Sequence, residues 1–426
     1  MSVVVVPVVP ASAIRPADIA RAATACGYAP TFVTSAGSME PAEQEEYARF
    51  GPVLECDPER PSEAVPALRG HAPTAIVTFS EGMVPTTGEL AVGLGLPYHD
   101  RDTVAALTDK WTQRWRLAEH GVDTVWSVAV TSREAALEVL ASRPGPVVVK
   151  PRRSQSSRDT YLVEAAAALP AEVRPSAQRP FVLEEFLTGR DEGDFGDYVS
   201  VESVVVDGEP VTLGVTGKFP LLPPFREQGQ FLPSHLPQDE LDRAARLASA
   251  ALRALGVRRG LAHTELKLTP DGPRLIEVNG RIGGFLGDLY QRGTGQDLLT
   301  LGMAASCGLP VTPRAAPTAG GVHFQYSNLP PTCGGVLREV AGVEKVRQET
   351  GVVGYATRIA AGAELAPGVM TFFMDLLRGD ATDHASMLAT IDRCLAHLQF
   401  SFEQADGTVS HWRAGRDGLH RTTDGR

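Results

Sequence analysis

Cysteine is scarce in this sequence. Its 426 residues include five cysteines, an odd number, dispersed along the chain and without a Cys-x-x-Cys pair. A disulfide framework requires a dense, even set of cysteines, and a zinc site requires closely spaced ligands, so neither is predicted. Dispersed, reduced thiols are typical of a cytoplasmic protein, and that is the location we expect.

Long apolar runs and a basic charge balance are also lacking. The longest apolar run, Val3–Val9, is interrupted by Pro7 and is far shorter than the ~20 residues of a membrane span. No basic segment precedes it as in a signal peptide. Forty Lys plus Arg against 51 Asp plus Glu give a net charge of −11. We therefore expect no nucleic-acid and no membrane partner, whereas a local basic pocket for a phosphate substrate is compatible with this balance.

The first hundred residues alternate strand and helix signals but lack the Gly-x-Gly-x-x-Gly turn of a dinucleotide site. Val3–Val9 is a β-branched run of the kind that is buried on both faces of a parallel sheet. A helix is predicted at Asp18–Cys26, and further strands are predicted at Thr31–Thr34, Val53–Cys56 and Thr74–Phe79. The pattern predicts a small doubly wound α/β unit that serves mainly as a scaffold.

From about Arg101 the pattern changes to a mixture of helices and longer strands. Helices are predicted at Asp109–His120, Arg133–Ala141, Asp239–Leu255 and His384–Leu398. Extended segments are predicted at Thr124–Val130, Pro146–Pro151, Phe181–Phe186, Tyr198–Val206, Val211–Gly217, Ala262–Leu268, Arg274–Val278, Gly320–Tyr326, Gly354–Ala360 and Val369–Leu376. The last ~15 residues are polar and are expected to fray.

Three lysines stand at the ends of predicted elements. Lys110 lies at a helix start in Thr-Asp-Lys, Lys150 ends the Val-Val-Val-Lys-Pro strand, and Lys218 ends the strand Val211–Gly217. A lysine at the end of an apolar strand is costly to bury without a negative partner, which a polyphosphate supplies. Taken singly, each lysine is better explained as a solvated surface cation.

Two predicted neighbouring strands carry acids on one face. Strand alternation places Glu265 on the same face as His263 and Lys267, and Glu277 on the same face as Asn279. Carboxylate and amide oxygens on neighbouring strands are hard ligands of the kind that Mg²⁺ uses beside nucleotide phosphates. The alternative is a solvent-exposed polar face, with Glu265 paired to Lys267 or to an arginine.

The order of these motifs is more informative than any one of them. Within residues 1–310 the motifs follow one another in a fixed order. The order is Lys, a 40-residue gap, Lys-Pro, Glu-Glu-Phe-Leu-x-Gly, Tyr-x-Ser-Val-Glu, Lys, His-Thr-Glu and Glu-Val-Asn-Gly-Arg. This order resembles the ATP-grasp ligase superfamily. Within it, the segments Asp197–Glu202, Asp207–Glu209, Phe231–Ser234 and His263–Leu268 are similar to the L-amino acid ligases of the bacilysin type, which make dipeptides.

The resemblance implies an α/β (α+β) protein with the ATP-grasp fold. The implied parts are an N-terminal doubly wound α/β domain at residues 1–108, a central subdomain at 109–186, a C-terminal ATP-grasp subdomain with the metal site at 187–310, and an accessory α+β subdomain at 311–426. It also implies an ATP-dependent ligase that joins an amino acid or similar small acid to the amine of a second amino acid through an acyl phosphate. The implied cofactors are ATP and two Mg²⁺ ions, with Mn²⁺ as an alternative, and a homodimer is expected by analogy alone.

The resemblance further implies a role for each matching residue. The residues implied in ATP binding are Lys110, Lys150, Ser154, Ser156, Ser157, Glu184, Glu185, Phe186, Leu187, Asp191, Asp197 and Lys218. The implied metal ligands are Glu265, Glu277 and Asn279, and the implied substrate contacts are Glu227, Gln230, Arg281, Gly283 and Gly284. Arg281, Lys218 and His263 are implied in catalysis, although a hydrogen-bonded structural role for His263 explains that residue as well as a role as general base.

The sequence departs from the family's pattern at three places. The loop Arg152–Arg158, after Lys-Pro, contains no glycine, so serine hydroxyls and guanidinium groups would replace bare backbone amides around the phosphates. Tyr198 stands where many relatives place an acid on the ribose, which leaves Asp197 or Asp191 for that contact. Gln230 stands where the bacilysin-type ligase has a histidine, which predicts a different amino-acid preference.

Two other functions fit the same motifs. One is an ATP-grasp enzyme of the purine or carboxylase type, but the sequence shows no biotinyl-lysine domain and its dipeptide-ligase-like segments disfavour a purine enzyme. The other is a catalytically idle ATP-binding module that acts through protein contacts. The missing glycines favour this module, whereas the full set of lysines and carboxylates disfavours it.

Overall fold

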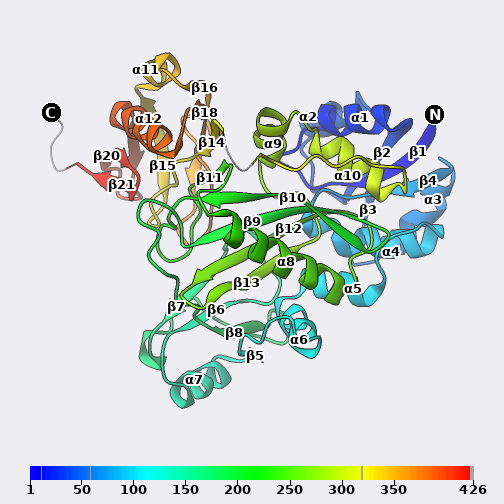
Figure 1. Ribbon diagram of the computed structural model, residues 1–426, viewed down its shortest axis with the longest axis horizontal. Helices are drawn as coiled ribbons and strands as arrows, with labels where there is room; N and C mark the ends of the chain where they lie inside the picture. Colours follow the sequence, from blue (N-terminus) through cyan, green and yellow to red (C-terminus); the bar gives the residue numbers. More distant parts are fainter. Residues whose placement is uncertain (11, 58, 318–319, 423–426) are drawn as a thin grey trace.

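A computed structural model of the protein describes residues 1–10, 12–57, 59–317 and 320–422. Figure 1 shows the N-terminal elements in blue at one side, a small unit in cyan and teal below, a long twisted sheet in green at the centre, and the C-terminal elements in orange and red at the other side. Among the described residues, no helix has both the length and the apolar character needed to cross a bilayer.

The N-terminal sheet is parallel and is buried on both faces. Its order is β3-β2-β1-β4, with β1 at Ser2–Pro7, β2 at Tyr28–Ser35, β3 at Val53–Cys56 and β4 at Pro73–Ile76. Val4 and Val6 of β1 belong to one hydrophobic core and Val5 to another, because successive side chains face opposite sides of a strand. The surrounding helices are α1 (Pro16–Ala25), α2 (Pro41–Ala48), α3 (Val65–Arg69), α4 (Val84–Leu94) and α5 (Arg101–Thr108), with short turns η1 (Pro61–Ala64) and η2 (Glu81–Met83). The predicted doubly wound unit is confirmed.

The second unit is a small antiparallel sheet with the order β5-β8-β6-β7. Its strands are β5 (Ser127–Val130), β6 (Val147–Pro151), β7 (Tyr161–Val163) and β8 (Phe181–Glu185), and its helices are α6 (Lys110–Glu119), α7 (Arg133–Ser142) and the turn η3 (Ala166–Ala168). Asp109 caps α6, since its carboxylate accepts the Thr112 amide at 3.0 Å. This cap fixes Lys110 in the first turn of the helix.

The third sheet has eight strands in the order β13-β12-β9-β10-β11-β14-β18-β16. The strands are β9 (Tyr198–Val206), β10 (Glu209–Lys218), β11 (Gly229–Leu232), β12 (Gly260–Thr269), β13 (Gly272–Asn279), β14 (Val322–Tyr326), β16 (Val352–Thr357) and β18 (Asp375–Ala381). Val199 and Val201 of β9 pack against α8 (Gln238–Ala254) in one core, so the alternate residues of β9 face the other side. The helices α9 (Leu286–Thr294) and α10 (Leu298–Ser306) follow β13.

This large sheet is continuous across residue 310, because β14, β16 and β18 pair onto the strands that precede them in the chain. The predicted boundary between 187–310 and 311–426 therefore does not coincide with the edge of a sheet. The division of the chain at residues 108, 186 and 310 stays a prediction.

The fourth sheet lies near the C-terminus, with the order β17-β15-β19-β20-β21. Its strands are β15 (Gly335–Ala341), β17 (Glu364–Leu365), β19 (Gln399–Glu403), β20 (Val409–Gly415) and β21 (Gly418–Arg421), and its helices are α11 (Val343–Gln348) and α12 (His384–His397). The expectation that the end of the chain frays is wrong up to residue 422, because Trp412 and Leu419 join the core around Phe402. Residues 423–426 lie outside the description.

The predicted strand Val369–Leu376 is wrong over most of its length. The strand β18 begins only at Asp375, and Val369–Phe373 instead forms an irregular segment, which we call the strap. Its apolar side chains do not alternate between a core and solvent. Met370, Phe372 and Phe373 line an internal cavity, which explains why a strand-like composition lies outside any sheet.

Candidate active site

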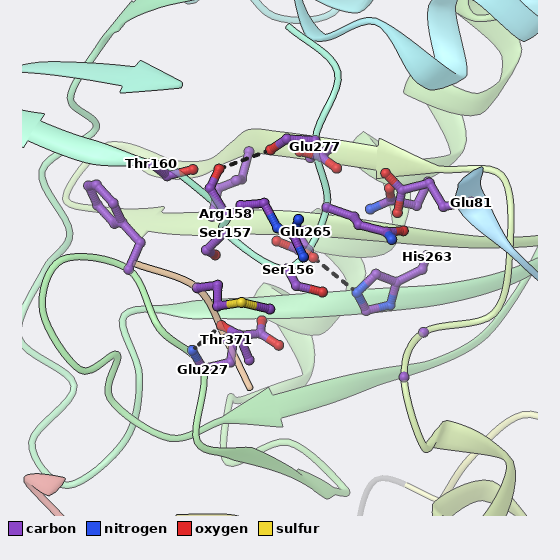
Figure 2. Close-up of a pocket in the computed structure, with 18 of the residues that line it drawn as sticks. Glu81, Ser156, Ser157, Arg158, Thr160, Glu227, His263, Glu265, Glu277 and Thr371 are labelled. Atoms are coloured by element: carbon purple, nitrogen blue, oxygen red, sulfur yellow. Dashed lines mark hydrogen bonds and ion pairs between the residues drawn. The ribbon is translucent and has the colours of Figure 1, made fainter. Parts of the chain in front are cut away.

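A cavity of about 680 Å³ lies where the four groups of elements meet. Its walls are residues 9, 10 and 12–14 after β1, residues 79–81 after β4, the ends of β6 and β8, the polar face of the large sheet, and the strap. Figure 2 shows part of this lining, including Glu81, Glu265 and Thr371. Ligands of α/β proteins commonly bind outside the carboxyl ends of parallel strands, as here beside β1 and β4. The volume is in the range of small-molecule sites.

Lysine is concentrated in this cavity. Only five of the 40 Lys plus Arg residues are lysines, and four of those five line the cavity, whereas Lys345 lies on α11. The four pairs of lysine and carboxylate are Lys110–Glu277 (3.0 Å), Lys150–Glu184 (2.8 Å), Lys218–Glu227 (3.6 Å) and Lys267–Asp197 (2.6 Å). A lysine ammonium is a compact charge that binds phosphate well and is costly to bury. The arrangement therefore points to an anionic ligand with several charges.

Glu184 is the centre of a buried ion-pair cluster. Its Oε2 accepts Lys150 Nζ at 2.8 Å and Arg114 Nη2 at 3.0 Å. Although burial alone would raise it, Arg114 and Lys150 lower the pKa of Glu184 to about 2. Its other oxygen, Oε1, is buried without a partner among the described residues. The sequence analysis included Glu184 among the residues implied in ATP binding but missed Arg114, which lies one helical turn after Lys110 on α6.

Residues 184–187, which the resemblance implies in ATP binding, line the cavity at the end of β8, and we call them the hinge. The Glu185 amide donates to Trp126 O at 3.0 Å and the Phe186 amide donates to Pro146 O at 3.3 Å, so the fold uses both groups. The Leu187 amide donates to no residue of the described part of the chain. Leu187 is therefore the hinge residue whose amide is left for a ligand.

The predicted metal ligands face one another across β12 and β13. Glu265 is directly opposite Glu277 in the antiparallel register, and His263 is opposite Asn279. In the orientation that satisfies its neighbours, the Asn279 amide donates to Glu277 Oε1 at 3.0 Å and to Glu81 Oε2 at 3.2 Å. If the Asn279 amide group rotates by half a turn, its oxygen faces Glu277 and Glu81 in place of its nitrogen. Asn279 Oδ1 and the carboxylates of Glu265 and Glu277 are then oxygen ligands of the kind that Mg²⁺ takes. Within residues 1–10, 12–57, 59–317 and 320–422 no group of three or more His, Cys, Asp or Glu side chains is placed to hold a metal ion.

His263 is buried between two carboxylates. Its Nδ1 lies 2.8 Å from Glu202 Oε1. Its Nε2 lies 3.2 Å from Glu265 Oε1 (Figure 2). Burial opposes the charged form, but Glu202 and Glu265 raise the pKa of His263 to about 9. A Cβ at Gly283 would lie 2.6 Å from His263 Nδ1, so only glycine allows this close approach. The ring is therefore held as an imidazolium, which favours a positioning role over that of a general base.

Arg281 and Glu81 join the end of β13 in the large sheet to the N-terminal unit. Arg281 Nη2 donates to Glu81 Oε2 at 2.6 Å, and both side chains line the cavity. The sequence analysis missed Glu81, although an acid in the turn η2, which follows the parallel strand β4, is a usable signal.

The predicted substrate wall surrounds Lys218. Lys218 Nζ donates to Gln230 Oε1 at 3.2 Å, and Gln230 Nε2 donates to Gly284 O at 2.7 Å. Glu227, Gln230, Gly283 and Gly284 all line the cavity. Gln230 thus connects the lysine at the end of β10 with the glycine pair that follows β13.

The glycine-free loop is held at two points along its length. Ser154 O accepts Lys110 Nζ at 2.7 Å, and Ser156 O accepts the Thr371 amide of the strap at 2.8 Å. Ser156 and Ser157 adopt left-handed conformations, with φ of 57° and 52°. Glycine adopts this conformation without strain, whereas other residues rarely do. The strap compensates for the missing glycines by holding the loop over the cavity.

Two predicted ATP contacts lie outside the cavity wall. The Asp191 carboxylate accepts the Gly193 amide at 2.9 Å within its own exposed turn. Asp197 pairs with Lys267 at 2.6 Å, and it is Lys267 that lines the cavity. The other residues predicted for ATP, metal and substrate line the cavity together.

The cavity thus gathers four lysines and the facing carboxylates Glu265 and Glu277 at the meeting point of the sheets. Residues 143–288 match the ATP-grasp domain family. The chain is 30% identical over 230 residues to a D-alanine–D-alanine ligase of Cereibacter sphaeroides, covering 51% of this chain and 67% of the relative. The protein belongs to the ATP-grasp superfamily and has its fold.

Other relatives are similar over about half of this chain. Carnosine synthase 1 of Gallus gallus is 32% identical over 47% of this chain and 23% of its own length. The alanine–anticapsin ligase of Bacillus subtilis is 28% identical over 50% of this chain and 49% of its own. The chain thus spans about half or less of these two relatives. The crystal structure of an L-amino acid ligase from Bacillus licheniformis has the same fold, with a TM-score of 0.75, 21% identity, and coverage of 93% of this chain and 98% of that one.

Proposed function

We propose that this protein is an ATP-dependent carboxylate–amine ligase. It joins the carboxylate of an amino acid or similar small acid to the amine of a second amino acid and releases ADP and phosphate. The observation that carries the proposal is the convergence of four of the five lysines, two facing carboxylates and Arg281 in one cavity of an ATP-grasp fold. The ligases among its relatives support it.

The first proposed step activates the carboxylate. Oxide is a poor leaving group, so a carboxylate oxygen attacks the γ-phosphorus of ATP, the bond to the β,γ-bridging oxygen breaks, and ADP leaves. This transfer depends on in-line placement and on neutralised phosphate charge. We assign Lys110 and Lys150 to the ATP phosphates, Lys218 to the γ-phosphate, and the Leu187 amide to the adenine edge.

The second proposed step forms the amide. The amine attacks the acyl carbon of the acyl phosphate, and the tetrahedral oxyanion collapses as phosphate leaves with the original carboxylate oxygen. We assign Arg281 and the amides of Gly283 and Gly284 to this oxyanion, because donors aimed at developing charge lower the barrier. His263 acts in this scheme as a positioning residue that fixes Glu265.

Glu265, Glu277 and Asn279 would hold magnesium. When bound, Mg²⁺ neutralises charge on the phosphate oxygens. The proposal includes two ions, which the carboxylates on two separate strands support. It also includes replacement of Mg²⁺ by Mn²⁺. The cytoplasmic location is supported by five cysteines without a disulfide, and the homodimer by analogy alone.

A substitution in the strap is expected to uncouple ADP release from amide formation. Thr371 Oγ1 accepts the Glu227 amide at 3.0 Å while its own amide holds the loop at Ser156. Thr371→Val keeps the shape but removes the acceptor, so we expect water to reach the acyl phosphate more often. The ratio of ADP released to amide product should rise severalfold, with Thr357→Val, on β16 outside the cavity, as the control. An unchanged ratio would show that the strap does not exclude water.

The test of the proposed function is an incubation of purified protein with Mg·ATP and pooled amino acids. The expected result is ADP release that depends on amino acids, together with a new mass equal to two substrates minus water. AMP and pyrophosphate would refute the acyl-phosphate route. ATP binding in a titration without any ADP release would instead support the idle module.

A further inference from the structure

Arg358 is an unusual cation in this cavity. It follows β16, its backbone amide donates to Met374 O at 2.8 Å, and its guanidinium lies 4.6 Å from the centre of the Phe285 ring. The other basic residues of the large sheet that line the cavity are paired with carboxylates, as Lys218, Lys267 and Arg281 show. Among the described residues, no carboxylate lies within ion-pair distance of Arg358.

The surroundings of Arg358 add a second positive charge. Partial burial lowers the pKa of Arg358, and the nearby charge of Arg15 lowers it further. Arg15 stands at the start of α1, directly after the loop that lines the N-terminal wall of the cavity. Two guanidinium charges near one another, with no carboxylate within ion-pair distance of Arg358 among the described residues, favour an anion at this wall.

The wall beside Arg358 is apolar. Phe285 and Phe373 pack with ring centres 5.7 Å apart, and the cavity wall continues with Ile14, Met370, Phe372 and Leu376. Phe285 directly follows Gly284, whose carbonyl accepts Gln230 Nε2. The apolar wall and the guanidinium therefore adjoin the glycine pair that we assign to the acyl oxyanion.

We propose that Arg358 binds the carboxylate of the amine-bearing substrate and that Phe285 and Phe373 receive a large apolar side chain of the same molecule. The assignment to the amine-bearing substrate rests on the proposed function, whereas the site for a carboxylate and an apolar group does not. The guanidinium stacked on Phe285 is held in one plane, so it is prepared for two parallel hydrogen bonds to a carboxylate. The second substrate is accordingly an α-amino acid with an aromatic or long aliphatic side chain and a free carboxylate.

The test measures binding without turnover. L-phenylalanine and L-phenylalaninamide, which lacks the carboxylate charge, are titrated calorimetrically into the protein with Mg²⁺ and the β,γ-methylene analogue of ATP. The wild-type protein is expected to bind the acid about 10- to 100-fold more tightly than the amide, as a charge-assisted hydrogen-bonded pair implies. Arg358→Ala should reduce this preference to within about threefold. The control Arg413→Ala, an exposed arginine on β20 outside the cavity, should keep the preference.

Three results would overturn the proposal: no binding of L-phenylalanine to the wild-type protein, equal binding of acid and amide, or a preference that survives in Arg358→Ala. A variant that weakens acid and amide equally would also count against it, since a merely structural arginine has that effect. The thermal unfolding midpoint of each variant separates misfolding from a lost contact, and Arg358→Lys, which keeps the charge, should retain part of the preference. Because no turnover is needed, failure of the ligase assay leaves this test intact.

Discussion

Replacing Lys150 by alanine is expected to reduce amino-acid-dependent ADP release by about 10²- to 10³-fold. Lys150 ends β6 inside the cavity and lies 2.8 Å from Glu184. The loss of a preorganised positive charge at transferring phosphate groups typically has this size. The measurement is the initial rate of ADP release at saturating ATP and amino acids.

The fold should survive the loss of Lys150. Glu184 keeps Arg114 at 3.0 Å, so the variant does not leave an unpaired buried carboxylate, whose cost would be several kcal/mol. Burial lowers the pKa of Lys150, because the cavity solvates the ammonium charge less well than water does. Removal of this charge is therefore not expected to unfold the protein. Lys345→Ala, the one lysine outside the cavity, is the matched control. Near-wild-type ADP release by Lys150→Ala, with the control also active, would contradict the assignment of this cavity to ATP.

The second large effect is expected for Glu277→Gln. The substitution keeps the shape of the side chain but removes the negative charge that faces Glu265 across the strands and pairs with Lys110 at 3.0 Å. A neutral amide is a much weaker ligand for Mg²⁺ than a carboxylate. We expect the maximal rate to fall at least about 10²-fold and the Mg²⁺ concentration for half-maximal activity to rise.

The check for Glu277→Gln is a series of ADP-release rates over a range of Mg²⁺ concentrations. Glu364→Gln, an exposed acid on β17, should leave both the rate and the Mg²⁺ dependence unchanged. If Glu277→Gln kept the wild-type Mg²⁺ dependence, the strands β12 and β13 would not hold the ion.

Local sequence patterns predicted most of the architecture but not its long-range pairing. The β-branched run at Val3–Val9 predicted β1 because burial on both faces leaves a signal in the run itself. The continuity of the large sheet across residue 310 has no such signal, since the pairing of β11 with β14 joins segments about a hundred residues apart. The strap was misread for a related reason: apolar residues that line a cavity have the composition of a strand.

The residues of the candidate site also fall into two groups, those that local sequence patterns predict and those that they do not. Lys110, Lys150, Lys218, Glu265 and Glu277 stand at the ends or on one face of predictable elements, and their order suggested that they meet. Arg114, Glu81 and Arg358 reach the cavity from three different parts of the chain. The sequence contains no local pattern that pairs Glu81 with Arg281, two hundred residues away. Such contacts follow only from the way the N-terminal unit sits on the large sheet (Figure 1).

The central claim is that this cavity activates a carboxylate by phosphorylating it. The most direct test uses an amino acid that supports ADP release, with both carboxylate oxygens replaced by ¹⁸O, followed by mass analysis of the released phosphate. The account predicts that one ¹⁸O atom appears in inorganic phosphate for each amide bond formed, because phosphate leaves the acyl phosphate with that oxygen. Phosphate without ¹⁸O, or ¹⁸O in AMP, would contradict it.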